Sequence, residues 1–147
     1  MSAERDPKGS MATVAAPIKT ALVEAALEAR HQAYAPYSRF SVGAAVMARD
    51  GRIFTGVNVE NASYPLTVCA ERNAIAAAVL AGAREIVAVA VATSVSPPSA
   101  PCGGCRQVIA EFAREATIAL VNPQGERVET TLGELLPRAF RGQELLP

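Results

Sequence analysis

The chain has 147 residues, a length that fits one domain with room for a sizeable apolar core. Its 14 basic and 14 acidic residues cancel, so neither nucleic acid nor an anionic membrane is an expected partner, and a small, weakly charged substrate is favoured. No apolar run approaches the roughly 18 residues of a membrane span. Three cysteines, an odd number, fit poorly with a disulfide framework, so we expect a cytoplasmic protein.

The first half of the chain predicts a helix followed by a hairpin. Residues 1–16 mix charge with proline and glycine and are expected to form a disordered tail, which leaves 17–147 as a single domain. Apolar residues at helical spacing predict a helix from 18 to about 32. Asp50-Gly51 is a strong turn signal between two predicted strands, 40–48 and 52–59. The polar segment 58–68 contains Pro65 and is expected to be irregular.

The second half alternates helices and strands. An alanine-rich helix is expected at 69–81 with Gly82 at its end, then a buried strand at 86–93 and a proline-rich loop. A helix at 103–114, strands at 117–121 and 126–130, and a short helix from 132 that Pro137 interrupts complete the chain. This order predicts an α/β fold, with a mixed sheet of about five strands between helices in a three-layer α/β/α arrangement.

The cysteines carry the strongest chemical signal. Cys102 and Cys105 form a Cys-x-x-Cys pair, which alone is weak, but Cys69 lies 33 positions earlier and is followed by Glu71. Three thiolates suit Zn²⁺ and leave the fourth tetrahedral position open for water. An open position beside a carboxylate is typical of catalytic zinc. The pattern therefore predicts a zinc hydrolase of the deaminating kind, with Zn²⁺ as its cofactor.

The positions of these residues on their helices agree with that chemistry. Both cysteine sites fall where a loop becomes a helix, and helix N-termini lower the pKa of a thiol. Glu71 is about 200° around the helix from Cys69, so it suits a proton shuttle better than a ligand. Three thiolates on Zn²⁺ leave a net negative charge, which Arg72, or in second place Arg106, is expected to offset.

Plainer interpretations exist for each residue taken alone. A single cysteine is more often a buried apolar thiol, and Glu71 could be an ordinary first-turn carboxylate. Asn58 and Glu60 could be solvated residues, although their i, i+2 spacing on an extended segment puts both on one face. Aromatic residues such as Phe40 are most often core or interface packing.

Several separate segments carry a resemblance to a known family. They are Ala33-Tyr-Ala-Pro-Tyr-Ser-Arg-Phe40, Val42-Gly-Ala-Ala45, Gly56-Val-Asn-Val-Glu-Asn-Ala-Ser-Tyr64, Cys69-Ala-Glu-Arg72, Pro101-Cys-Gly-Gly-Cys-Arg-Gln107 and Glu134-Leu-Leu-Pro137. Over about residues 21–140 the chain resembles the small zinc-dependent cytidine deaminases. The resemblance implies a cytidine deaminase-like fold. It also implies hydrolytic deamination of cytidine and deoxycytidine, with release of ammonia, in pyrimidine salvage.

The resemblance also assigns roles to residues. It implies that Cys69, Cys102 and Cys105 hold zinc and that Glu71 is the proton shuttle. The substrate contacts that it implies are the ribose ligands Asn58 and Glu60, the pyrimidine-packing Phe40, and three positions that a neighbouring subunit contributes in a homotetramer, Ala62, Tyr64 and Phe140. Arg72 and Gln107 match positions behind the metal ligands.

Three competing functions remain open. A non-enzymatic zinc module needs a fourth protein ligand, and the chain has no spare cysteine and one distant histidine, His31. A redox protein using Cys102 and Cys105 leaves the Cys69-Ala-Glu segment unexplained. The enzymatic alternative is a deaminase of a modified cytosine nucleoside or a nucleoside antibiotic.

Overall fold

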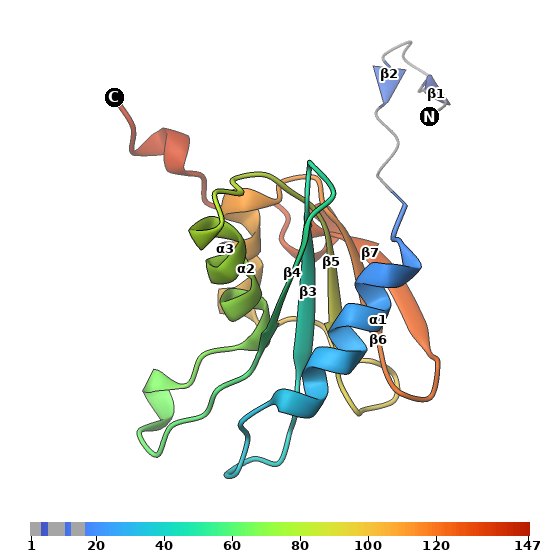
Figure 1. The fold of residues 1–147 in the computed structure, drawn as a ribbon. Coiled ribbons are helices and arrows are strands. Elements are labelled where there is room, and N and C mark those ends of the chain that lie inside the picture. The colour runs from blue at the N-terminus through green and yellow to red at the C-terminus, as the bar shows by residue number, and fades with distance from the viewer. Residues whose placement is uncertain (1–3, 6–10, 13–16) are drawn as a thin grey trace.

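The structure is a computed structural model that describes residues 4–5, 11–12 and 17–147 (Figure 1). Its centre is a five-stranded mixed sheet with the order β4-β3-β5-β6-β7, in which β5 and β6 are parallel and the other neighbours antiparallel. The bounds are β3 (Gly43–Ala48), β4 (Ile53–Val57), β5 (Ile86–Ala92), β6 (Thr117–Val121) and β7 (Arg127–Thr131). The predicted mixed sheet of about five strands is confirmed.

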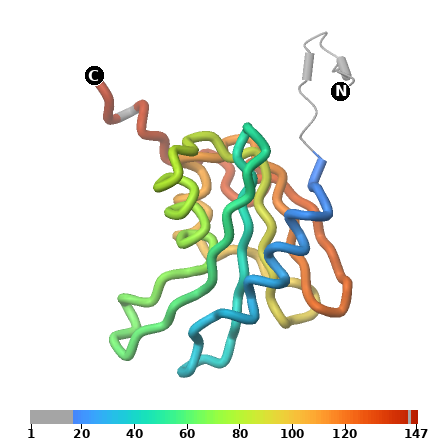
Figure 2. The backbone as a smooth tube through the Cα atoms, viewed as in Figure 1, coloured from blue at the N-terminus to red at the C-terminus, as the bar shows by residue number. Residues whose placement is uncertain are grey.

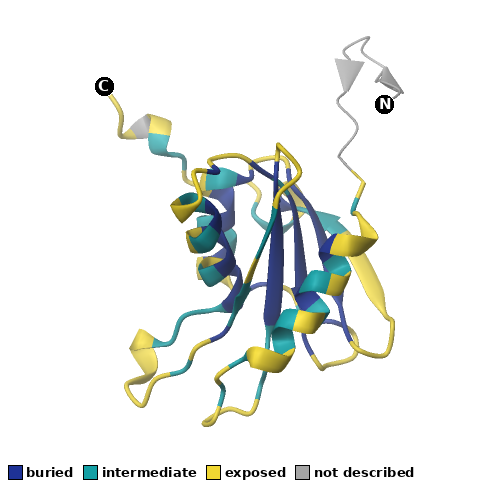
Figure 3. Ribbon diagram, viewed as in Figure 1, coloured by how far each residue is buried: buried dark blue, intermediate teal, exposed yellow. Residues whose placement is uncertain are grey.

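Helices cover both faces of this sheet. Helix α1 (Thr20–Ala29), extended by the 3₁₀ turn η1 (Arg30–Gln32), lies on one face, and α2 (Ala70–Leu80) and α3 (Gly103–Phe112) lie on the other (Figure 1). Two buried apolar clusters separate the layers, and Figure 3 shows the central strands buried between exposed helix surfaces. The three-layer α/β/α arrangement is confirmed.

The strand β5 shows why its sequence is a nearly unbroken apolar run. Val89 and Val91 belong to the cluster under α2 and α3, whereas Ala88, Ala90 and Ala92 belong to the cluster under α1. Both faces of a central strand are buried, so neither set can be polar. The smaller side chains leave space for α1 to pack closely.

The predicted hairpin is present but shorter than expected. Gly51 adopts a φ of 92° in the turn, a conformation that glycine reaches at little cost. β3 begins at Gly43 because the preceding residues bond to the side chain of Asn58 and not to a strand. β4 ends at Val57, since Val59 pairs instead with Tyr34 and Val68. Figure 2 shows the loop before β3 and the loop after β4 side by side at the lower end of the molecule.

Two glycines let the helices approach the hairpin from opposite sides. A Cβ on Gly43 would lie 2.1 Å from the carbonyl oxygen of Ala26 in α1. A Cβ on Gly56 would lie 2.3 Å from the amide nitrogen of Ala74 and 2.5 Å from the carbonyl oxygen of Ala70, both in α2. Only glycine permits these contacts, so Gly56 sets the distance between α2 and the sheet.

The remaining elements are short. They are η2 (Tyr64–Leu66), α4 (Leu132–Leu135), η3 (Gly142–Glu144) and an antiparallel pair of two-residue strands, β1 (Glu4–Arg5) and β2 (Met11–Ala12). The other residues of the predicted disordered tail, 1–16, lie outside the described residues, so that expectation stays a prediction. None of the helices in the described ranges combines the length and apolarity that crossing a bilayer requires.

Candidate active site

The two cysteine-bearing helices begin at the same edge of the sheet. In Figure 1 the lower ends of α2 and α3 are their starts, and they lie toward the end of the sheet at which β5 ends. Cys69 is the N-cap residue of α2 and Cys102 is that of α3, and neither side chain caps its own helix. Both thiols are therefore available to contact each other and Cys105 in the first turn of α3.

The three sulfur atoms have the spacing of a zinc site. All lie within 4.8 Å of one another, and the Sγ atoms of Cys69 and Cys102 are 3.9 Å apart. Tetrahedral zinc with Zn–S bonds of about 2.3 Å requires sulfurs about 3.8 Å apart. Within the part of the chain that the structure describes, no fourth histidine, cysteine or carboxylate joins this group. The donor set fits Zn²⁺ with one position left for water, which disfavours a closed structural site.

The electrostatics of the thiols also favour a cation. A hydrogen bond from the Cys105 thiol lowers the pKa of Cys69 to about 6, against the opposing effect of burial. The same hydrogen bond, followed by burial, raises the pKa of Cys105. One thiolate thus forms at the expense of its neighbour. Three thiolates this close together need a positive ion between them.

Glu71 is buried beside the cysteines. It is the second residue of α2, its exposed fraction is 4%, and it lines a pocket next to Cys69 and Cys102. Burial raises the pKa of its carboxyl, since a charged carboxylate loses hydration there. A carboxyl whose protonated form is favoured by burial is suited to receiving a proton and giving it up again.

The pocket has a volume of about 320 Å³ and collects most of the predicted substrate residues. Phe40, Asn58 and Glu60 line it together with Glu71, Cys69 and Cys102. Four hydroxyl residues that the sequence reasoning did not single out also line it: Ser38, Thr67, Thr93 and Ser99. A rule that could have found Thr93 is that α/β sites lie at the carboxyl ends of strands, because Thr93 directly follows β5.

Asn58 and Glu60 also have a structural task that the sequence did not reveal. Asn58 donates from Nδ2 to the carbonyl of Phe40 at 2.7 Å and accepts the N–H of Val42 at 2.8 Å. Oε1 of Glu60 accepts the N–H groups of Tyr37 at 2.9 Å and Ser38 at 3.1 Å. The hydrogen bond from the Ser38 side chain, reinforced by these N–H groups, lowers the pKa of Glu60. The two residues therefore fix the segment that carries Phe40.

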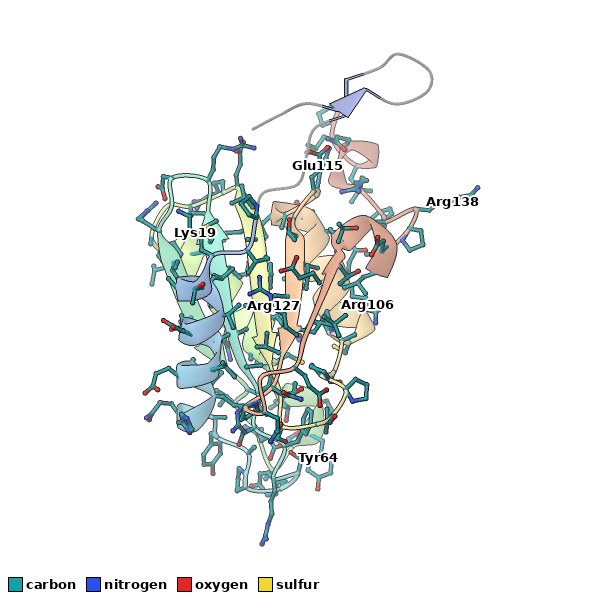
Figure 4. All side chains as sticks on the ribbon, turned by 90° about the vertical axis from the view of Figure 1, so that its right-hand side faces the viewer. Lys19, Tyr64, Arg106, Glu115, Arg127 and Arg138 are labelled. Carbon is teal, nitrogen blue, oxygen red and sulfur yellow. The ribbon has the colours of Figure 1, made fainter. Side chains whose placement is uncertain are left out.

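Three predicted substrate residues lie outside the pocket of their own chain. Ala62, Tyr64 and Phe140 are exposed, Tyr64 at 70% and Phe140 at 55%. The ring of Tyr64 makes a T-shaped contact with that of Tyr37, with ring centres 6.0 Å apart, and Figure 4 shows Tyr64 at the lower end of the molecule. The side chain of Gln107 bonds to the C-terminal part of the chain: its Nε2 donates to the carbonyl of Phe140 at 3.0 Å.

The two candidate arginines differ in their partners. Arg72 is exposed, and its charge contributes to lowering the pKa of Cys69, after the larger effects of the neighbouring thiols. Arg106 donates from Nε to the carbonyl of Pro101 at 2.8 Å and from Nη1 to that of Leu135 at 2.9 Å. It lies on α3 facing the C-terminal part of the chain (Figure 4) and ties the loop before Cys102 to α4. Arg72 is thus the better candidate to offset thiolate charge.

Comparison with known proteins agrees with this geometry. Residues 17–121 match the family model of the cytidine and deoxycytidylate deaminase zinc-binding region. The chain is 49% identical to a cytidine deaminase of Halalkalibacterium halodurans over 84% of this chain and 95% of that protein. It is 43% identical to a cytidine deaminase of Mycobacterium tuberculosis over 83% of this chain and 88% of that one.

Solved structures give the same result. A cytidine deaminase of Burkholderia pseudomallei superposes with a TM-score of 0.81 at 50% identity, covering 84% of this chain and all of that one. The family model spans the segment containing all three cysteines, Glu71 and the strands β3 to β6. The chain belongs to the zinc-dependent cytidine deaminases.

Proposed function

We propose that the protein hydrolyses cytidine and deoxycytidine to uridine and deoxyuridine, releasing ammonia, as a step of pyrimidine salvage. The observation that carries this proposal is the meeting of three thiols and a buried carboxyl at one pocket of about 320 Å³. That volume lies in the range of small-molecule sites. Membership of the deaminase family supplies the reaction type.

The three cysteines would hold the metal. Zn²⁺ bound by Cys69, Cys102 and Cys105 would supply a Lewis acid that makes water nucleophilic at neutral pH. The chain contributes the shape of the site, because two of the ligands are N-cap residues whose thiols do not bond to their helices and the third is buried in a first turn. Thiolate ligands persist in a reducing compartment, which supports a cytoplasmic location.

Glu71 would move the protons. It would take one proton from the attacking water and give it to the ring nitrogen N3, then take the second proton of that water and give it to the departing amino group, so that cytidine and water become uridine and ammonia. Burial at the start of α2 keeps this carboxyl beside the cysteines. In this role Glu71 is not a metal ligand, in agreement with its exclusion from the three-sulfur group.

Asn58 and Glu60 would bind the sugar, while Phe40 packs against the base. Oε1 of Glu60 accepts two backbone N–H groups, and a carboxylate has about four acceptor sites in all, so that it could also accept from a ribose hydroxyl. The described residues of the pocket include two carboxylates, Glu60 and Glu71, and neither lysine nor arginine. A 5′-phosphate would meet only negative charge there, so a nucleoside and not a nucleotide is the proposed substrate.

We also propose a homotetramer in which neighbours complete each pocket. The segment 58–68, which carries Ala62 and Tyr64, forms a loop at the lower end of the molecule, while the segment after Phe140 extends from the upper end (Figure 1). Exposed aromatic side chains at two separate places on the surface suggest contacts with more than one neighbour.

One experiment tests the reaction. Purified protein is incubated with cytidine, deoxycytidine and deoxycytidylate while the absorbance change of deamination is followed, and zinc is measured per chain. We expect turnover of both nucleosides and not of the nucleotide. Glu71→Gln should keep its zinc and lose about 10²-fold or more of kcat, the usual share of general acid–base catalysis. Normal turnover by this variant, or a metal-free active protein, would contradict the proposal.

A further inference from the structure

Two buried polar side chains hydrogen-bond to the backbone of the loop that precedes Cys102. This loop covers residues 94–101, between the end of β5 and the start of α3. Cys102 is exposed, unlike Cys105, so packing around its own side chain does not fix it. The position of its sulfur must depend on the loop that precedes it.

Thr93 closes this loop from the inside. It directly follows β5, its exposed fraction is 2%, and its Oγ1 accepts the N–H of Ser99 at 3.1 Å. The hydrogen bond joins the two ends of the seven-residue segment 93–99, and Ser99 lies three positions before Cys102. Thr93, Ser99 and Cys102 all line the pocket, so this hydrogen bond joins two residues of the pocket lining.

Asn122 holds the same loop from the neighbouring strand. Ala92 and Val121 are register partners at the ends of β5 and β6, so Thr93 and Asn122 follow side by side. Asn122 is 1% exposed; its Nδ2 donates to the carbonyl of Val95 at 3.1 Å and its Oδ1 accepts the N–H of Glu126 at 3.0 Å. Asn122 lies outside the pocket lining. Its amide therefore has no direct route to substrate.

We propose that Thr93 and Asn122 are positioning residues for the zinc ligand Cys102. The inference rests on the proposed zinc ligation by that cysteine. Thr93 fixes the end of the loop next to the ligand, and Asn122 fixes the end next to the sheet. Groups that orient a ligand typically contribute about 10-fold to 100-fold in metal affinity.

The test measures zinc release as well as activity. Thr93→Val keeps the shape of the side chain and removes the acceptor, Thr93→Ser restores a hydroxyl, and Asn122→Ala removes the outer attachment. Each zinc-loaded protein is mixed with a chromogenic chelator, and the release rate, kcat, KM and melting temperature are recorded. Arg52→Met is the matched control, because Arg52 donates to the carbonyl of Ala81 at 3.1 Å at the opposite end of α2.

We expect Thr93→Val and Asn122→Ala to release zinc about tenfold faster than the parent protein, and Thr93→Ser to return to the parent rate. Arg52→Met should lose stability without faster release, since about 16 Å of helix separates it from Cys69. If Thr93→Val does not fold, Asn122→Ala carries the same measurement. Parent-like release from the folded variants would overturn the inference, and so would equally fast release from Arg52→Met. A parent protein that binds no zinc would instead contradict the proposed function.

Discussion

Glu60 accepts the backbone N–H groups of Tyr37 and Ser38 and also lines the pocket, where we propose that it binds the sugar. Its lowered pKa keeps it ionised below the usual glutamate range. Because the pKa of Glu60 is depressed in the folded state, its ionisation contributes fully to stability above the ordinary glutamate pKa. This contribution is lost only as pH falls through the lowered pKa.

We therefore expect the Glu60→Gln defect to be independent of pH over the working range. The variant should raise KM for cytidine about tenfold, the size of one hydrogen bond to a charged group, with the same ratio to the parent at about pH 5.5 and about pH 8. Steady-state kinetics at both values checks this. A defect that shrinks toward the lower pH would show that the carboxylate of Glu60 is already protonating there.

Arg72 is predicted to act through charge alone. Its guanidinium helps to lower the pKa of the Cys69 thiol, and no hydrogen bond holds its side chain among those found for the described residues. Arg72→Gln should therefore leave the fold unchanged and weaken zinc retention or move the pH optimum upward. Metal content after dialysis and a pH–rate profile measure the two effects. Arg84→Gln, which changes a charge at the far end of α2, should alter neither.

At the scale of elements, Gly43 and Gly56 form a natural pair of test sites. Both lie in one hairpin and both touch helix backbone where a Cβ would stand, but Gly43 meets α1 and Gly56 meets α2. Of these two helices, α2 and not α1 has a proposed metal ligand, Cys69, as its N-cap and contains Glu71. The two helices therefore differ in what their displacement would disturb.

We predict that alanine at either position destabilises the fold by about 1–3 kcal/mol, because overpacking forces the backbone to move. Gly56→Ala should also lose zinc and kcat, whereas the folded fraction of Gly43→Ala should keep both. Denaturant unfolding, zinc content and kinetics on the same preparations separate the effects. Equal losses of zinc in both variants would show that the position of α2 does not control the site.

The elements themselves could be predicted largely from local signals. Asp50-Gly51 predicted the hairpin, Gly82 the end of α2, and the Val/Ala run the buried strand β5, because each depends on residues that are close in sequence. The three-sulfur group was predictable from residue type and order. The hydrogen bonds of the Asn58 and Asn122 side chains could not be predicted, because a buried amide has no sequence periodicity. Asn58 bonds to a carbonyl 18 positions away and Asn122 to one 27 positions away.

At the scale of the whole molecule, residues that the resemblance assigns to substrate contacts lie outside the pocket of a single chain. Tyr64 and Phe140 are exposed and outside the lining of their own pocket, while every proposed catalytic and metal-binding residue comes from one chain. If neighbours complete the site, a site needs Glu71 from one subunit and Phe140 from another. Two differently damaged chains could then restore one another.

We predict complementation between Glu71→Ala and Phe140→Ala. Each variant alone should be weakly active or inactive, because all sites lack either the proton shuttle or the partner's aromatic ring. After the two are unfolded together and reassembled, sites that pair the intact Glu71 of one chain with the intact Phe140 of the other should recover about a quarter of parent activity, as random mixing implies. Light scattering should give about four times the 15.3 kDa chain mass. Simple averaging of the two activities at every mixing ratio would mean that each pocket is built from one chain only, and the exposed aromatic residues would then need another explanation.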